Sequence, residues 1–146
     1  MKKNWHLLGL LTVIFGLTSC QDHYYIENEF HGMWQVTSIT NKNTGEVNEP
    51  QGSLYYSFQR SMVRLSYKSS IPEVMVNYVS YFDIIAPDSI GMGEFVFSSV
   101  KEDEKVPIDN LHKFGIYQDY TTFGVEHNKN KLVLNSEESL IELRKY

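Results

Sequence analysis

From Phe30 to its end, the chain alternates between apolar and polar residues with a period of two, and this pattern limits the fold more than any other feature. Successive side chains of a β-strand point to opposite faces, so this alternation is typical of half-buried strands and not of helices. The predicted strands are residues 34–39, 54–58, 63–67, 74–85, 90–100, 121–127, 131–135 and 139–145.

The alternation also predicts which side chains share a face. In the second strand we expect Leu54, Tyr56 and Phe58 to lie together, and in the third Arg64 and Lys68 to oppose the apolar face. In the first strand, one predicted face holds Trp34, Val36 and Ser38, and the other holds Gln35, Thr37 and Ile39.

Turn residues and one short helical pattern separate these strands. Residues 128–130 and 136–138 are polar turns at hairpin spacing, so the last three strands are predicted to form an antiparallel meander. Residues 107–115 read as a short helix, because Pro107 suits a first turn and Gly115 can end it. Residues 41–52 form a long first loop.

The fold class follows from this count of elements. Eight antiparallel strands with one short helix predict an all-β domain, and the chain length fits a single domain with a substantial core. Closing the strands into a barrel removes the edges that would otherwise pair between molecules. An open sandwich is the alternative.

The N-terminal segment has a different composition. Lys2 and Lys3 precede an apolar run of 11 residues, Leu7 to Leu17. A helix needs about 20 apolar residues to cross a membrane, so this run is too short, and a basic start before a short apolar core predicts a secretory signal peptide.

The end of that segment, Leu17-Thr18-Ser19-Cys20, resembles the lipobox of bacterial lipoproteins. The resemblance implies that a lipoprotein signal peptidase cuts before Cys20, the only cysteine, which carries a diacylglycerol and is usually acylated by palmitate or a similar chain. Two or three chains on one residue make a durable membrane anchor. We therefore expect a signal peptide at residues 1–19, a lipidated tether at 20–29 and a barrel domain at 30–146.

The residue after the cysteine bears on location. The common inner-membrane retention signal of these lipoproteins is an Asp at that position, and here it is Gln21. The resemblance therefore implies a cell-envelope protein of the outer membrane, on its periplasmic or cell-surface face.

The charge of the processed chain excludes one class of partner. Removal of Lys2 and Lys3 leaves 11 basic residues against 18 acidic ones, a net charge of 11 − 18 = −7. A nucleic-acid-binding protein needs a basic patch, and the sequence offers none.

Gly32-Met33-Trp34 at the first strand resembles the G-x-W motif of lipocalins. In that family the tryptophan closes the barrel floor and a basic residue from the last strand packs across it. Arg144 and Lys145 are both candidates here, and strand parity does not decide between them. The closing segment KLVLNSEESLIELRKY also resembles the ending of lipocalin-like lipoproteins of Bacteroidetes-type bacteria, so the resemblance covers residues 30–146.

Aromatic residues recur at the predicted strand positions. We take five of them as candidate cavity-lining residues for a small hydrophobic or amphipathic ligand: Tyr56, Phe58, Tyr67, Tyr78 and Phe82. The alternatives are that they fill a solid core, or that the protein is a non-enzymatic envelope accessory protein acting through protein contacts.

Nothing in the sequence predicts an enzyme, a metal site or a cofactor. The histidines lack metal-ligand spacing, there is no G-x-S-x-G, and Cys20 is assigned to the anchor. Asp83 is a lone carboxyl within an apolar strand. We expect it to face solvent or to form a hydrogen bond near a strand end, and the alternative is a buried carboxylate. It would count toward catalysis only inside a cavity beside His127.

Overall fold

The computed structural model describes residues 29–70, 73–98 and 104–146. The predicted signal peptide, Cys20 and nearly all of the predicted tether lie outside these residues. The described elements are β1 (Gly32–Asn41), β2 (Val47–Asn48), β3 (Leu54–Gln59), β4 (Met62–Ser70), β5 (Glu73–Ala86), β6 (Ser89–Phe97), α2 (Ile108–Leu111), the 3₁₀ turn η1 (His112–Phe114), β7 (Tyr120–His127), β8 (Lys131–Asn135) and β9 (Ser139–Lys145).

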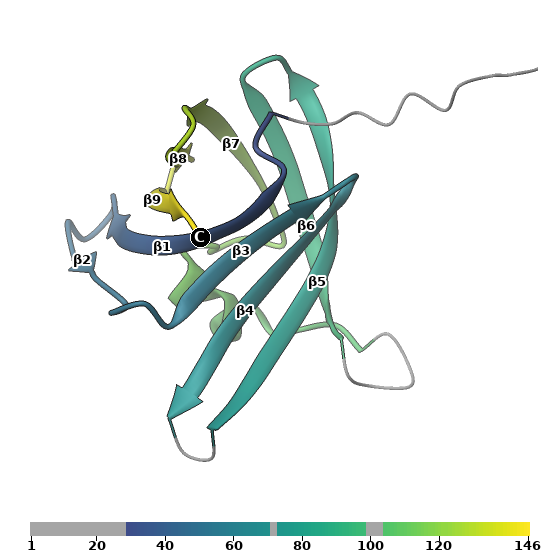
Figure 1. The fold of residues 1–146 in the computed structure, drawn as a ribbon. Coiled ribbons are helices and arrows are strands. Elements are labelled where there is room, and N and C mark those ends of the chain that lie inside the picture. Colours follow the sequence, from purple (N-terminus) through teal and green to yellow (C-terminus); the bar gives the residue numbers. More distant parts are fainter. Residues whose placement is uncertain (1–28, 71–72, 99–103) are drawn as a thin grey trace, which may run out of the picture.

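Eight of these strands close a barrel (Figure 1). From β3 to β9 each strand pairs antiparallel with the next, and β1 pairs with both β3 and β9. The two-residue strand β2, which lies within the predicted long loop, adds only a short pairing to the end of β1. The predicted antiparallel eight-stranded barrel with one short helix is confirmed, and the open sandwich is wrong.

A β-bulge in β1 changes which of its residues face inward. Val36 pairs with Leu143 but Ser38 pairs with Glu142, so Thr37 is an extra residue on β1. Such a residue shifts the alternation by one position. As a result Ile39 is buried in the core with Trp34 and Val36, and the prediction that it shares a face with Gln35 is wrong.

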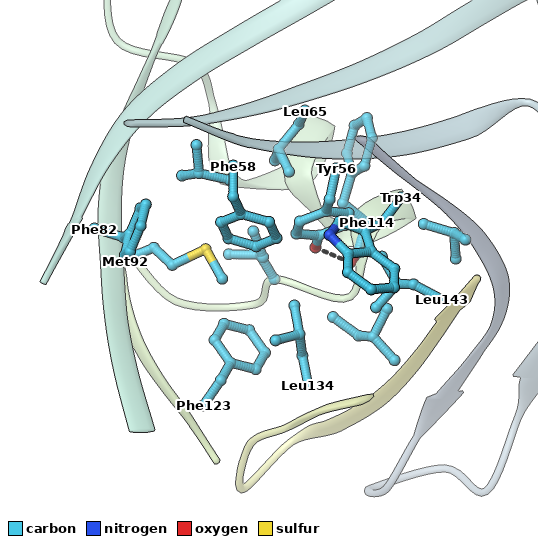
Figure 2. Close-up of a cluster of buried hydrophobic side chains, with 14 of the residues drawn as sticks. Trp34, Tyr56, Phe58, Leu65, Phe82, Met92, Phe114, Phe123, Leu134 and Leu143 are labelled. Carbon is cyan, nitrogen blue, oxygen red and sulfur yellow. Dashed lines mark hydrogen bonds between the residues drawn. The ribbon is translucent and has the colours of Figure 1, made fainter. Parts of the chain in front are cut away.

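The middle of the barrel is occupied by side chains (Figure 2). Strands from all around the barrel contribute large residues that are fully buried. The interior of an eight-stranded barrel is just wide enough for side chains to fill. The six bulkiest are Trp34, Tyr56, Phe58, Phe95, Phe114 and Phe123.

The predicted helix is confirmed, and together α2 and η1 cover one end of the barrel, called here the helix end. Phe114 is fully buried beneath this segment, and the Tyr56 hydroxyl donates a hydrogen bond to the Phe114 carbonyl, 2.6 Å away. The Ser139 hydroxyl donates to the Gly115 carbonyl, also at 2.6 Å. These two hydrogen bonds tie the helical segment to β3 and β9.

Gly115 ends the segment in the left-handed conformation, with φ of 81°. A Cβ at this position would lie 3.0 Å from the Ile141 side chain and 3.1 Å from that of Ile39. Glycine therefore meets two requirements here: the turn needs a positive φ, and the backbone approaches the inner face of the barrel closely.

We expect Tyr56→Phe to lower the free energy of unfolding by about 1–3 kcal/mol, because it leaves the buried Phe114 carbonyl without a donor. The measurement is urea denaturation. Tyr55→Phe is the matched control, since the Tyr55 hydroxyl also donates to a carbonyl, that of Gly52, but in a half-exposed position where water replaces it. Equal losses for the two variants would contradict the expectation.

Candidate functional site

At the end of the barrel opposite the helix, here called the tryptophan end, the core is sealed around Trp34. Trp34 pairs directly with Lys145 across β1 and β9. The Lys145 amino group lies over the Trp34 ring, 4.3 Å from its centre, and donates to the His31 carbonyl at 2.6 Å. The Trp34 ring nitrogen donates to the Phe30 carbonyl at 2.7 Å, so the indole is held from both sides.

Gly32 makes this arrangement possible. Its φ is 119°, and a Cβ there would lie 2.6 Å from the Lys145 amino group. Any other residue would push the ammonium away from the indole ring. The glycine of Gly32-Met33-Trp34 is thus explained by the path of the lysine side chain.

Arg144, the other basic candidate, lies on the opposite face of β9. Its Nε donates to the Gln35 side-chain oxygen at 2.7 Å. Gln35 is buried although it points away from the core, because it also contacts Gly52 and Tyr55. Of the two candidates, Lys145 packs across the tryptophan, and Arg144 links β9 to β1 on the outer surface of the barrel.

Phe30 completes the tryptophan end. Its ring lies 5.1 Å from that of Phe58 and 5.9 Å from that of Phe82, measured between centres. Beside it, His127 Nε2 lies 3.0 Å from a carboxylate oxygen of Glu29. The segment that enters the barrel therefore covers this end.

The five candidate lining residues all come from β3, β4 and β5 and point inward. Phe58 and Phe82 pack against each other near Phe30, with ring centres 5.5 Å apart. Tyr56 is fully buried under the helical segment, and burial raises the pKa of its hydroxyl far above the usual value. These three residues form part of the packed core.

Tyr67 and Tyr78 lie at the helix end instead. There they form an aromatic cluster with Phe97 and Phe114, in which neighbouring ring centres are 5.4–6.3 Å apart. Burial of the hydroxyl raises the pKa of Tyr78. The electrostatic interaction and the hydrogen bond with Tyr67 raise it further. The Tyr78 hydroxyl is therefore neutral at physiological pH.

The helix end is where the core comes partly to the surface. Four hydrophobic side chains pack against the core there without being fully covered: Tyr67, Val76, Phe97 and Ile108. The exposed Lys113 amino group lies 3.9 Å from the centre of the Tyr67 ring. This apolar surface with a cation at its rim, here called the helix-end surface, is the candidate functional site.

Sequence reasoning identified Tyr67 and Tyr78 but missed Phe97, Phe114 and Lys113. Phe114 lies in the predicted helix and was visible as a core residue. Strict alternation from Ile90 and Met92 would place Phe97 on the outer face, and it faces inward because the register of β6 shifts between Gly93 and Val96. The meeting of Phe97 and Phe114 with Tyr67 and Tyr78 depends on the path of residues 104–116 across the barrel end, which no local pattern encodes.

Other chemistry is scarce in the described part of the chain. No group of three or more His, Cys, Asp or Glu side chains in residues 29–70, 73–98 and 104–146 is arranged to hold a metal ion. Asp83 is exposed on the outer face, as expected. Within the same residues there is no helix long and apolar enough to span a membrane.

The closed antiparallel barrel, its G-x-W tryptophan and its lysine from the last strand define a protein of the lipocalin-like class. A family model described as a lipocalin-like domain matches residues 15–146, and the chain belongs to that family. Folds of this kind are generally non-enzymatic and are associated with ligand binding or accessory roles.

Two crystal structures share the fold. A lipocalin-like protein from Bacteroides uniformis is 19% identical, with a TM-score of 0.60 over 82% of this chain and 100% of that one. A protein from Bacteroides eggerthii is also 19% identical, with a TM-score of 0.61 over 81% and 100%. No curated protein matches the chain.

The Trp34–Lys145 contact is testable in a chain that begins at residue 20, in which Trp34 is the sole tryptophan. We expect Lys145→Met to change the Trp34 fluorescence emission and to lower the free energy of unfolding by about 0.5–1 kcal/mol, the range for an exposed cation–π contact. Arg144→Met is the control and should leave the emission unchanged. The reverse result would contradict the assignment of Lys145 to the indole ring.

Proposed function

We propose that this protein is a lipid-anchored, non-enzymatic component of the bacterial cell envelope that binds a small amphipathic ligand at the helix-end surface. The observation that carries the binding proposal is the partly exposed pair Tyr67 and Phe97, which packs on the buried rings of Tyr78 and Phe114 and is flanked by Lys113. Apolar and aromatic walls with a few placed polar groups are typical of small-molecule sites.

The helix end is favoured over the middle of the barrel for a physical reason. Between Trp34 and Phe114 the interior is already packed with side chains, so a ligand there would have to displace them (Figure 2). At the helix end the apolar side chains are still partly in contact with water. Covering them with a ligand releases that water without opening the core.

The chemistry of the surface selects a class of ligand. The partly exposed rings of Tyr67 and Phe97 favour a flat or narrow apolar body. The Tyr67 hydroxyl offers a hydrogen-bonding group, and Lys113 favours a negative charge. We therefore propose a ligand with an apolar body and an anionic head, such as a fatty acid.

The anchor rests on the lipobox resemblance at residues 17–20 and on the apolar run before it. The family membership and the Bacteroides structures are compatible with a bacterial envelope protein. The outer membrane is proposed because Gln21, and not Asp, follows the cysteine.

Cys20→Ala tests the anchor. We expect this substitution to abolish metabolic labelling with radioactive palmitate and to move the protein from the membrane fraction to the soluble fraction, because no other residue offers the thiol. Ser19→Ala, which keeps a small residue in the lipobox, is the control and should leave both unchanged. Full membrane retention of the Cys20→Ala protein would refute the anchor proposal.

Lys113→Ala tests the ligand site. With the fluorescent fatty acid cis-parinaric acid as the probe, we expect the dissociation constant to rise about threefold, the effect of losing one exposed charge contact. Lys129→Ala, in the turn between β7 and β8 at the tryptophan end, should bind the probe as the wild type does. No saturable binding by the wild-type protein would refute the ligand site, and equal effects of the two substitutions would refute its location.

A further inference from the structure

The outer face of β4 to β7 carries a patch of exposed apolar side chains, called here the outer patch. Tyr81 is 71% exposed, Ile85 and Tyr120 are 53% exposed, and Met62 is 43% exposed. Large apolar groups scattered singly over a surface need no explanation, whereas a contiguous group marks an interaction site.

These side chains are contiguous because two glycines lie beneath them. Met62 pairs with Tyr81, and Tyr81 and Tyr120 both pair with Gly93. A Cβ at Gly91 would meet the Tyr120 hydroxyl and would lie 3.1 Å from the Ile85 side chain. The tyrosine ring therefore lies flat over β6, and the isoleucine lies next to it.

The patch reaches the end of the barrel where the described chain begins. Phe30 packs on Phe82, and Tyr81 is the preceding residue of β5 on the opposite face. Ile85 lies beyond it on the outer face, next to the turn between β5 and β6. That turn and the start of the described chain lie at the same end of the barrel in Figure 1. The tryptophan end thus combines the chain entry with one edge of the patch.

The chain length outside the described residues limits how far this end is from the predicted anchor. Nine peptide units separate Cys20 from Glu29. Fully extended, nine residues span at most about 30 Å, which is comparable to the size of the domain. A lipid on Cys20 therefore keeps the tryptophan end within a barrel's length of the membrane surface.

We propose that the outer patch rests on the membrane that holds the lipid anchor, so that the barrel lies against the bilayer surface with the helix end turned away from the anchor. The proposal rests on the proposed anchoring at Cys20. The occupant of the patch is a lipid surface with zwitterionic headgroups, because tyrosine places an apolar ring and a polar tip at the level where headgroups meet hydrocarbon.

The charge in the patch sets the depth of the contact. Asp83 is exposed on the same face of β5, between Tyr81 and Ile85. A carboxylate is costly in hydrocarbon, so the contact is confined to headgroup depth. There the ammonium group of a zwitterionic lipid can pair with Asp83 while the flanking side chains reach the start of the acyl chains.

A fluorescent label tests the contact in the lipidated full-length protein. Because the thiol of Cys20 is occupied by lipid, a cysteine introduced by Ile85→Cys is the only free thiol, and so is one introduced by Asn43→Cys in the exposed turn at the helix end. Each variant is labelled with the environment-sensitive dye NBD and reconstituted in phosphatidylcholine–phosphatidylethanolamine vesicles containing doxyl-labelled lipid. Circular dichroism checks that both variants fold.

We expect the label at position 85 to show blue-shifted emission and quenching by the doxyl lipid, and the label at 43 to show neither. Adding Tyr81→Asp to the position 85 variant should reduce the quenching. Vesicle flotation with equal, weak quenching at both positions would overturn the contact and leave the anchor intact. A blue shift at 85 without lipid quenching would mean that protein covers the patch, which also overturns the proposal. Loss of flotation together with a reactive Cys20 would overturn the anchor and the contact with it.

Discussion

The pairing of β1 with β9 is the interaction on which the rest of the structure depends. These strands come from the two ends of the domain, and seven residue pairs join them. Without this pairing, β9 and much of β1 would be open edges. The same register builds both ends of the barrel. Trp34 meets Lys145 at one end, and Ile39 meets Ile141 near the other, where their side chains receive Gly115.

Much of the fold could be predicted from the sequence because it is encoded locally. Alternation of apolar and polar residues specified the barrel strands, and the polar turns specified the meander of β7, β8 and β9. The position of Ile39 could not be predicted, because the bulge at Thr37 is created by the pairing with β9, about a hundred residues away. A strand read by itself shows strict alternation and gives no sign of an extra residue.

The candidate site shows the same division. The sequence supplied Trp34 and two basic candidates, and only the register of β1 with β9 distinguishes Lys145 from Arg144. The five aromatic candidates were chosen because they recur at strand positions, and the structure shows that all five point inward. The alternation of a strand does not show how far along the barrel axis a side chain lies. In the structure Tyr67 and Tyr78 lie at the helix end, whereas Phe58 and Phe82 lie beside Phe30. Phe114 joins the aromatic cluster because the segment of residues 104–116 crosses the end of the barrel, and the sequence does not show this path.

The two ends of the barrel differ in what covers them, and this difference favours a division of roles. The tryptophan end is fixed by the cation over the indole, by the hydrogen bond from Trp34 to Phe30, and by aromatic contacts on three strands. The helix end is covered by the helical segment, which is held by hydrogen bonds from Tyr56 and Ser139 to consecutive carbonyls and by the packing of Phe114 on the rings of β3, β4 and β5. It leaves Tyr67 and Phe97 partly exposed. In the proposed arrangement, with the tryptophan end close to the anchor, a ligand reaches the helix-end surface from the aqueous side and not from within the bilayer. A fatty acid in that position would have to be dissolved or delivered by another carrier. This favours a ligand whose anionic head gives it some solubility, in agreement with the placement of Lys113 at the rim.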